Sequence, residues 1–290
     1  MRCSECGGSK VARSAVGLDS EFGKISTHSY RSGNECAVSV PNSMVAFNEA
    51  IVEATHDLVC AYKPNIAFYE EQGDEGFAAL HRTIRTIHAI APNVPVILDA
   101  KRADIGSTNI GYVRMAFDYL GVDAITVHPY LGAEALKPFL DREDKGIIVL
   151  CRTSNPGAGE FQDLMVKCPL AHLEFPSPEW PFYQHVAYRV MKYWNKNGNC
   201  AVVVGATYPD ELREVREIVG DMPILIPGIG TQGGDVEKTV TAGKNSRGQG
   251  MIINSSRGII FASDGENFAV AARREANKLR AAINQHLRAT

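Results

Sequence analysis

Short apolar runs alternate with longer segments of helical periodicity along most of the chain. Eight runs are rich in β-branched and other apolar residues and are predicted as strands: 11–19, 59–65, 94–101, 124–129, 146–153, 201–207, 223–230 and 250–256. Each run is apolar at most positions, which is typical of parallel strands that are buried on both faces. The pattern predicts an α/β protein with a parallel sheet.

The segments between these runs carry apolar residues three and four positions apart, as amphipathic helices do. Clear examples are 44–58, 76–90, 109–120 and 267–287. Eight strand–helix units in one chain of 290 residues favour a (β/α)8 TIM barrel. An open doubly wound sheet is the alternative, which the absence of a G-x-G-x-x-G motif after the first strand weakens.

We find no linker or internal repeat, so the sequence predicts a single barrel domain over 11–290, preceded by an N-terminal extension of residues 1–10. Two further stretches stand apart from the strand–helix pattern. They are the polar connection 20–40 and the Gly- and Pro-rich segment 154–181, both long enough to suggest a function.

Composition narrows the class of protein. The chain is 45% hydrophobic and 22% charged with a formal net charge of −3, and no basic stripe suggests nucleic acid as a partner. No apolar run approaches the roughly 18 residues of a membrane span, and the N-terminus lacks the apolar core of a signal peptide. Seven cysteines, an odd number, do not suggest a disulfide framework, so we expect a cytoplasmic protein.

Charged residues gather where the predicted strands end. Asp99 and Lys101 are two positions apart, so a regular strand would place them on one face at its carboxyl end, where barrels build active sites. Asp104 follows at the turn; it could simply cap a helix, although Ser107 could do so as well. Asp19 ends the first strand, and Lys63 and Asn65 end the second.

A single buried Lys–Asp pair is often only structural, but several such groups at one rim favour catalysis. Two glycine-rich turns, "IPGIGTQGG" after the seventh strand and "NSSRGI" after the eighth, are candidate phosphate sites, and Arg257 adds a fork of donors to the second. Either turn alone could be no more than a tight loop.

No metal or nucleotide-cofactor motif is found in the predicted barrel loops, so the chemistry is expected to rest on side chains. A lysine that forms a Schiff base needs a lowered pKa, whereas Lys101 lies between two acids in the sequence, which favours the ammonium form. We therefore interpret Lys101 as a proton donor.

The pattern Asp99-x-Lys101-x-x-Asp104, followed by Ile105 and Thr108, resembles the active-site signature of the orotidine 5'-phosphate decarboxylase family. Together with "KPNIAFYE", "RTSNPG" and "IPGIGTQGG", it resembles the longer, bacterial type 2 branch from about residue 11 to the C-terminus. The resemblance implies a (β/α)8 barrel that converts orotidine monophosphate to UMP in pyrimidine synthesis without a metal or organic cofactor. It also implies a homodimer with shared active sites.

The same resemblance implies roles for individual residues. Lys101 would donate the proton to the pyrimidine C6, Asp99 would face the substrate carboxylate, and Lys63 would link the acids to the ribose. The remaining assignments are Asp104, Ile105 and Thr108 reaching the partner's site, Asp19 and Asn65 at the ribose, Ser154 at the pyrimidine edge, and Gln232 and Arg257 at the phosphate. Binding of the phosphate would move 154–181 and the turn 230–234.

Some features fit less well or leave alternatives open. Ala103 stands where the family often has Gly, and Cys3 and Cys6 could begin a zinc site with His28 and Cys36, although an incidental pair is favoured. His128 is interpreted as structural. The functional alternatives are a magnesium-dependent hexulose-phosphate synthase of the same barrel group and an inactive barrel that binds a phosphorylated ligand.

Overall fold

The computed structural model describes residues 14–25, 39–167, 179–230 and 233–288. Every predicted strand is present in the main sheet, and each observed strand overlaps its predicted run. Their bounds are β1 (Ser14–Leu18), β2 (Val59–Pro64), β3 (Ile97–Arg102), β4 (Ala124–Val127), β5 (Gly146–Arg152), β8 (Cys200–Val204), β9 (Ile224–Pro227) and β10 (Met251–Ser255). The predicted 1–10 extension lies outside the described residues.

The strand order of the main sheet is β2-β1-β10-β9-β8-β5-β4-β3. The two ends of this order are themselves joined, because Tyr62 bridges Val96 and Asn65 bridges Asp99, both in parallel. A ring of parallel strands with helices between them is the (β/α)8 barrel class, so this prediction is confirmed and the open doubly wound sheet is excluded.

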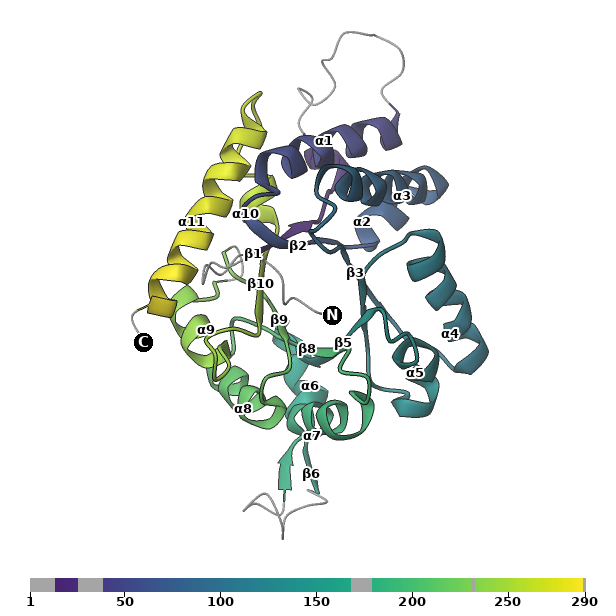
Figure 1. Ribbon diagram of the computed structural model, residues 1–290, viewed down its shortest axis with the longest axis vertical. Helices are drawn as coiled ribbons and strands as arrows, with labels where there is room; N and C mark the ends of the chain where they lie inside the picture. The colour runs from purple at the N-terminus through teal and green to yellow at the C-terminus, as the bar shows by residue number, and fades with distance from the viewer. Residues whose placement is uncertain (1–13, 26–38, 168–178, 231–232, 289–290) are drawn as a thin grey trace. The chain divides into compact units, whose positions relative to one another are not determined.

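Contacts between Cα atoms divide the chain into two compact units. The first consists of Ser9–Ala100, Tyr112–Thr126 and Ile252–Thr290. Its helical segments are α1 (Val40–Thr55), α2 (Ala67–Glu70), α3 (Gly73–Ile90), the 3-10 turn η1 (Phe22–Lys24), the π-helical η3 (Arg114–Tyr119), α10 (Arg257–Ile260) and α11 (Phe268–Arg288). In this unit α1 packs against α3 and α11 (Figure 1).

The start of α1 is explained by its local sequence, and its buried face packs against two phenylalanine rings. The Ser39 hydroxyl accepts a hydrogen bond from the main-chain N–H of Asn42, and Pro41 suits the first turn, so α1 starts earlier than the predicted 44. Phe47 of α1 is buried between Phe261 and Phe268, at ring-centroid distances of 5.7 and 5.1 Å. Aromatic packing of this kind fixes the last helix against the first.

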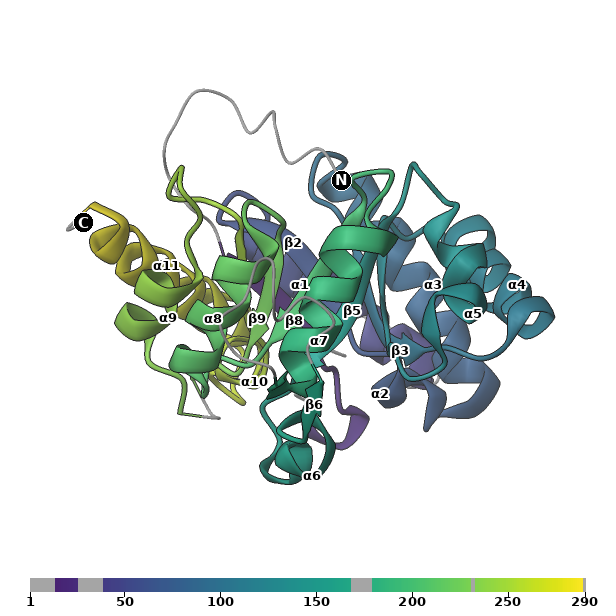
Figure 2. The same cartoon turned by 90° about the horizontal axis from the view of Figure 1, so that it is seen from below.

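Among the described residues, the second unit consists of Lys101–Gly111 and the described parts of Val127–Met251. Its helical segments are α5 (Gly132–Leu140), the 3-10 turn η4 (Pro156–Ala158), α6 (Gly159–Gln162), α7 (Phe182–Arg189), the π-helical η5 (Val190–Trp194), α8 (Pro209–Val219) and α9 (Val236–Gly243), while α4 (Gly106–Val113) ends beyond it. Figure 2 shows α8 beside α9. Buried Arg216 of α8 donates to four main-chain carbonyls, those of Gly220, Met222, Gly243 and Gly250.

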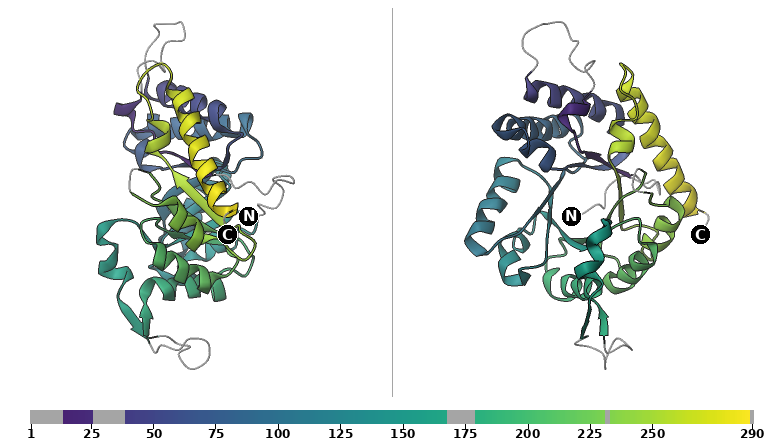
Figure 3. Two further views of the ribbon diagram at one scale, coloured as in Figure 1. Left: turned by 90° about the vertical axis from the view of Figure 1, so that its left-hand side faces the viewer. Right: turned by 180° about the vertical axis from the view of Figure 1, so that it is seen from behind.

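The described parts of the segment 154–181 contain regular elements that the sequence does not predict. Besides η4 and α6, it contains an antiparallel hairpin of β6 (Met165–Lys167) and β7 (Glu179–Pro181), which lies next to α7 (Figure 3). Trp180 of β7 is buried against Tyr188 of α7. Strands of three residues are too short to show a clear alternation of apolar and polar positions, so the sequence does not predict this hairpin.

Candidate active site

A buried ion pair joins Lys63, near the end of β2, to Asp99 within β3. The ammonium of Lys63 is 2.7 Å from Asp99 Oδ2, and both side chains are almost completely buried. The hydroxyl of Thr126, on β4, donates to Asp99 Oδ1 at 2.9 Å and accepts from the main-chain N–H of Ala100 at 3.0 Å. Asp99 is therefore held by donors on both carboxylate oxygens, which fixes its orientation.

The charge of Lys63 is stabilised in spite of its burial. Burial alone would lower the pKa of Lys63, but the negative charges of Asp99 and Asp19 and the hydrogen bond to Asp99 outweigh it, so the pKa is raised. Lys63, Asp99 and Asp19 thus form one electrostatic group in the first unit. The structure thus brings together three of the charged residues that the sequence places near the strand ends.

A second buried network fixes the end of β1, which carries Asp19. The Ser20 hydroxyl donates to Asn48 Oδ1 at 2.6 Å, and Asn48 Nδ2 donates to the hydroxyls of Tyr69 and Thr83. The Tyr69 hydroxyl donates to the Leu18 carbonyl. Among the residues that the structure describes, Oδ1 of Asp19 is buried and has no hydrogen-bond partner.

Lys101 differs from the prediction in its backbone. Its φ is 48°, in the left-handed region that residues with a side chain rarely adopt. The predicted shared face of Asp99 and Lys101 requires a regular pleat. Lys101 interrupts the pleat, so alternation from Asp99 does not fix the direction of its side chain. Lys101 is exposed, whereas Asp99 is buried.

Asp104 begins a turn that is held by a residue the sequence analysis missed. Buried Asn109 accepts from the main-chain N–H of Asp104 at 2.9 Å and donates to its carbonyl at 2.5 Å and to that of Ala135 at 2.6 Å. Asp104 Oδ1 accepts from the N–H of Ile105, which precedes the first residue of α4, so this bond is not the helix cap considered from the sequence. Ile105 and Thr108 are both exposed.

The remaining predicted residues lie at other strand ends. Asn65 follows β2, and its Oδ1 accepts from the N–H of Ala67. Arg257 is exposed at the start of α10, directly after β10. A side chain on Gly17 of β1 would place its Cβ 1.8 Å from the Ser256 hydroxyl, so Gly17 permits this close approach of the Arg257 turn.

Ser154 follows β5 and lies against the end of β8. A Cβ on Gly205 would be 2.8 Å from the Ser154 Cβ and 2.9 Å from its Cα, so this contact requires glycine. The turn after β9 has positive φ at Gly228, Gly230 and Gly233, as a tight glycine-rich loop requires. Gln232, in the same turn, lies outside the described residues.

Three further sequence interpretations concern a metal site, His128 and membrane spans. The described residues contain no group of three or more His, Cys, Asp or Glu side chains placed to hold a metal ion, and all four candidate zinc ligands lie outside them. His128 is half-buried, and its main-chain N–H donates to the Arg102 carbonyl. No helix in 14–25, 39–167, 179–230 or 233–288 is long and apolar enough to cross a membrane.

The fold and these groups define a class: a (β/α)8 barrel whose strand ends carry a buried ammonium–carboxylate pair and a glycine-rich turn. Residues 40–272 match the model of the orotidine 5'-phosphate decarboxylase / HUMPS family. The chain belongs to this family.

Individual relatives agree with the family assignment. The chain is 44% identical to an orotidine 5'-phosphate decarboxylase from Janthinobacterium over 96% of this chain and 95% of the relative. It is 51% identical to one from Ralstonia pickettii over 84% and 85%. The solved OMP decarboxylase of Leishmania donovani is 37% identical, with a TM-score of 0.73 and coverage of 92% and 93%.

Proposed function

We propose that this protein decarboxylates orotidine 5'-phosphate to UMP and CO2 in pyrimidine biosynthesis. The observation that carries the proposal is the buried Lys63–Asp99 pair, held by Thr126 next to Asp19, in a chain of this family. Asp99, Lys101 and Asp104 also keep the acid–base–acid order of the family's signature. Two relatives, 44% and 51% identical to this chain, are named orotidine 5'-phosphate decarboxylase.

In the proposed chemistry, the ammonium group of Lys101 stabilises the negative charge that decarboxylation leaves on C6, a role that an organic cofactor plays in other decarboxylases. The bond between C6 and the carboxylate carbon breaks, CO2 leaves, and the electron pair remains on C6. Lys101 stabilises this charge and donates its proton to C6, giving UMP. Asp99 faces the departing carboxylate, and the raised pKa of Lys63 keeps a positive charge between the acids and the ribose.

The other groups bind the nucleotide. Asp19 and Asn65 hold the ribose, Ser154 reads the pyrimidine edge, and Arg257 with Gln232 in the glycine-rich turn binds the phosphate. We propose that the enzyme uses no metal or organic cofactor. We also propose that it is a single-domain barrel of the type 2 branch and that it works in the cytoplasm.

We further propose a homodimer in which Asp104, Ile105 and Thr108 enter the partner's site. Exposure supports this, since the apolar Ile105 side chain is 63% exposed in the single chain. The turn that presents it is fixed by buried Asn109, so these residues are presented on a rigid element.

Purified protein mixed with orotidine 5'-phosphate should cause the substrate's ultraviolet absorbance to fall, with or without a chelator. Absence of turnover would contradict the decarboxylase function and favour the inactive, ligand-binding barrel. Loss of turnover on chelation would instead indicate the magnesium-dependent alternative.

Lys101→Ala should reduce kcat by at least about 10⁴-fold, because it removes both the proton donor and the stabilising charge. UMP binding, measured by calorimetry, should remain detectable. A Lys101→Ala variant with full activity would refute the assigned proton donor.

A further inference from the structure

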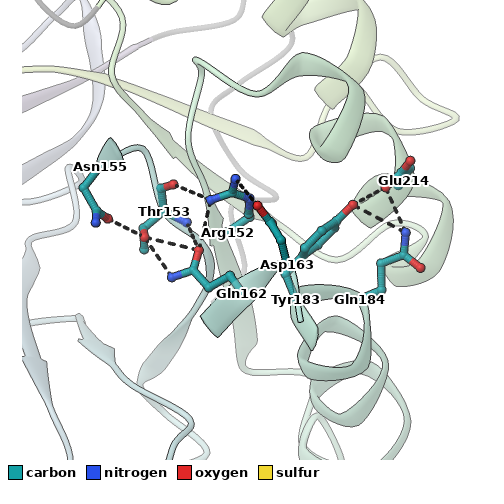
Figure 4. A network of polar contacts seen from close by, with 8 residues as sticks. All are labelled: Arg152, Thr153, Asn155, Gln162, Asp163, Tyr183, Gln184 and Glu214. Atoms are coloured by element: carbon teal, nitrogen blue, oxygen red, sulfur yellow. Dashed lines mark hydrogen bonds and ion pairs between the residues drawn. The ribbon is translucent and has the colours of Figure 1, made fainter. Parts of the chain in front are cut away.

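The side-chain amide of Gln162, at the end of α6, contacts Thr153 in the turn after β5 with both its oxygen and its nitrogen (Figure 4). Its Oε1 accepts from the main-chain N–H of Thr153 at 2.8 Å, and its Nε2 donates to the Thr153 hydroxyl at 2.9 Å. A main-chain N–H can only donate, so the atom facing it must be the oxygen. Both ends of the amide thus hold Thr153.

The hydroxyl proton of Thr153 is committed elsewhere. Thr153 Oγ1 is 2.7 Å from Asn155 Oδ1 and 3.3 Å from Gln162 Oε1. With one proton to donate, the hydroxyl gives it to the nearer acceptor and accepts from Gln162 Nε2. The three side chains form a directed chain of hydrogen bonds in which each polar atom has a compatible role.

Arg152 joins this turn to two other elements. Its guanidinium, 3% exposed, donates to Asp163 Oδ2 at 3.2 Å, to the Thr153 carbonyl at 3.3 Å and to Gln162 Oε1 at 3.4 Å. The same group lies 3.9 Å from the ring centroid of Tyr208, which follows β8. The base of the turn is therefore fixed to α6 on one side and to the β8 loop on the other.

Ser154 comes directly after Thr153, and Gly205 limits it from the other side. We propose that Gln162 is a positioning residue that sets Ser154 against the pyrimidine edge of the nucleotide. This inference rests on the proposed function, since it takes its meaning from the role assigned to Ser154. Through Gln162, α6 would contribute to recognition of the base. The sequence did not predict this helix.

The test replaces Gln162 by leucine, which keeps the size and removes both hydrogen bonds. Gln162→Leu should raise the KM for orotidine 5'-phosphate and the Ki for UMP about tenfold. The Ki for ribose 5-phosphate, which lacks the base, should stay unchanged. Gln184→Leu is the matched control: Gln184 lies in the same region but donates to Glu214, at 2.8 Å, so both inhibition constants should match the wild type.

A double-mutant cycle with Ser154→Ala separates positioning from general damage. If Gln162 acts through Ser154, the double variant should be no weaker toward UMP than Ser154→Ala alone. Additive losses, or an equal loss of ribose 5-phosphate binding, would overturn the inference. Both outcomes are read against an active wild type, whereas failure of the proposed function would appear as a wild type without turnover.

Gln162→Glu is a second, conservative variant, which keeps the inference testable if Gln162→Leu does not fold. One carboxylate oxygen still accepts from the Thr153 N–H and gains an ion pair with Arg152, and the Thr153 hydroxyl can turn its proton from Asn155 to the other oxygen. UMP affinity should therefore return to within about threefold of the wild type. If Gln162→Glu is as weak as Gln162→Leu while both melt like the wild type, Gln162 does not act by holding Thr153.

Discussion

Lys101 is a residue whose backbone conformation has an energetic cost. A side chain at φ 48° costs about 1 kcal/mol relative to glycine, and such strain persists where the surrounding structure requires it. A lysine in this position is consistent with selection for its ammonium group and not for stability. Two substitutions of Lys101 can therefore separate the cost of its backbone conformation from the role of its ammonium group.

Lys101→Gly should be about 1 kcal/mol more stable than Lys101→Ala, because glycine adopts the left-handed region freely and alanine does not. Both variants lack the ammonium group and should be equally inactive. Urea unfolding of the two proteins measures the difference. Equal stabilities would mean that the backbone at this position is not strained.

The alkaline limit of stability should report on Lys63. Its pKa is raised above the ordinary 10.5, so the pair's contribution is complete below about pH 10.5 and is lost as pH rises through the raised value. The free energy of unfolding of the wild type minus that of Lys63→Met should therefore be constant from pH 7 to 10 and shrink above it. A difference that grows with pH would show that the pKa is lowered instead.

At the scale of elements, hydrogen bonds between distant segments hold the helices that frame the barrel. Arg273 of α11 contacts both carboxylate oxygens of Asp57 at 2.6 and 2.9 Å and donates to the Ala54 carbonyl at 2.7 Å. The Arg273 side chain lowers the pKa of Asp57 to about 2. This bidentate contact joins the last helix to the end of α1.

Asp57→Asn should cost less than about 1 kcal/mol at pH 7, since both partners are about half exposed and solvent screens the pair. Because the pKa of Asp57 is lowered, its contribution is present above about pH 4 and is lost as pH falls through about 2. The wild type and the variant should therefore converge below about pH 2, and at neutral pH in 1 M salt. A gap that persists at about pH 1 would point to a cause other than the ion pair.

At the scale of the whole molecule, the proposed dimer predicts complementation between inactive chains. A heterodimer of Lys101→Ala and Asp104→Ala subunits would contain one site with both defects and one with neither. Equal mixing after subunit exchange should restore about a quarter of wild-type activity, since half of the dimers are mixed and each has one intact site of two.

Each variant alone provides the control and should be nearly inactive. If the activity of the mixture equals the sum of the activities of the two variants alone, Lys101 and Asp104 of one chain serve the same site. Full activity of a protein that sediments as a monomer would have the same meaning.

Sequence patterns predicted the barrel well because each strand is short, apolar and followed by a helical period. The same reasoning grouped Asp99 with Lys63 through the meeting of parallel strand ends. It failed at Lys101, where one left-handed residue ends the alternation, and at β6 and β7, whose three residues are too few to show a period.

The sequence by itself determined the fold class, the set of charged residues at the strand ends and the family. Only the tertiary structure decided which groups hold them: Thr126 on Asp99, Asn48 behind Asp19, Asn109 on the Asp104 turn and Gln162 on Thr153. The physical reason is that periodicity is a local property, read from neighbouring positions. A buried amide or hydroxyl is paired only when the folded chain brings a distant acceptor to it, and no local pattern records that partner.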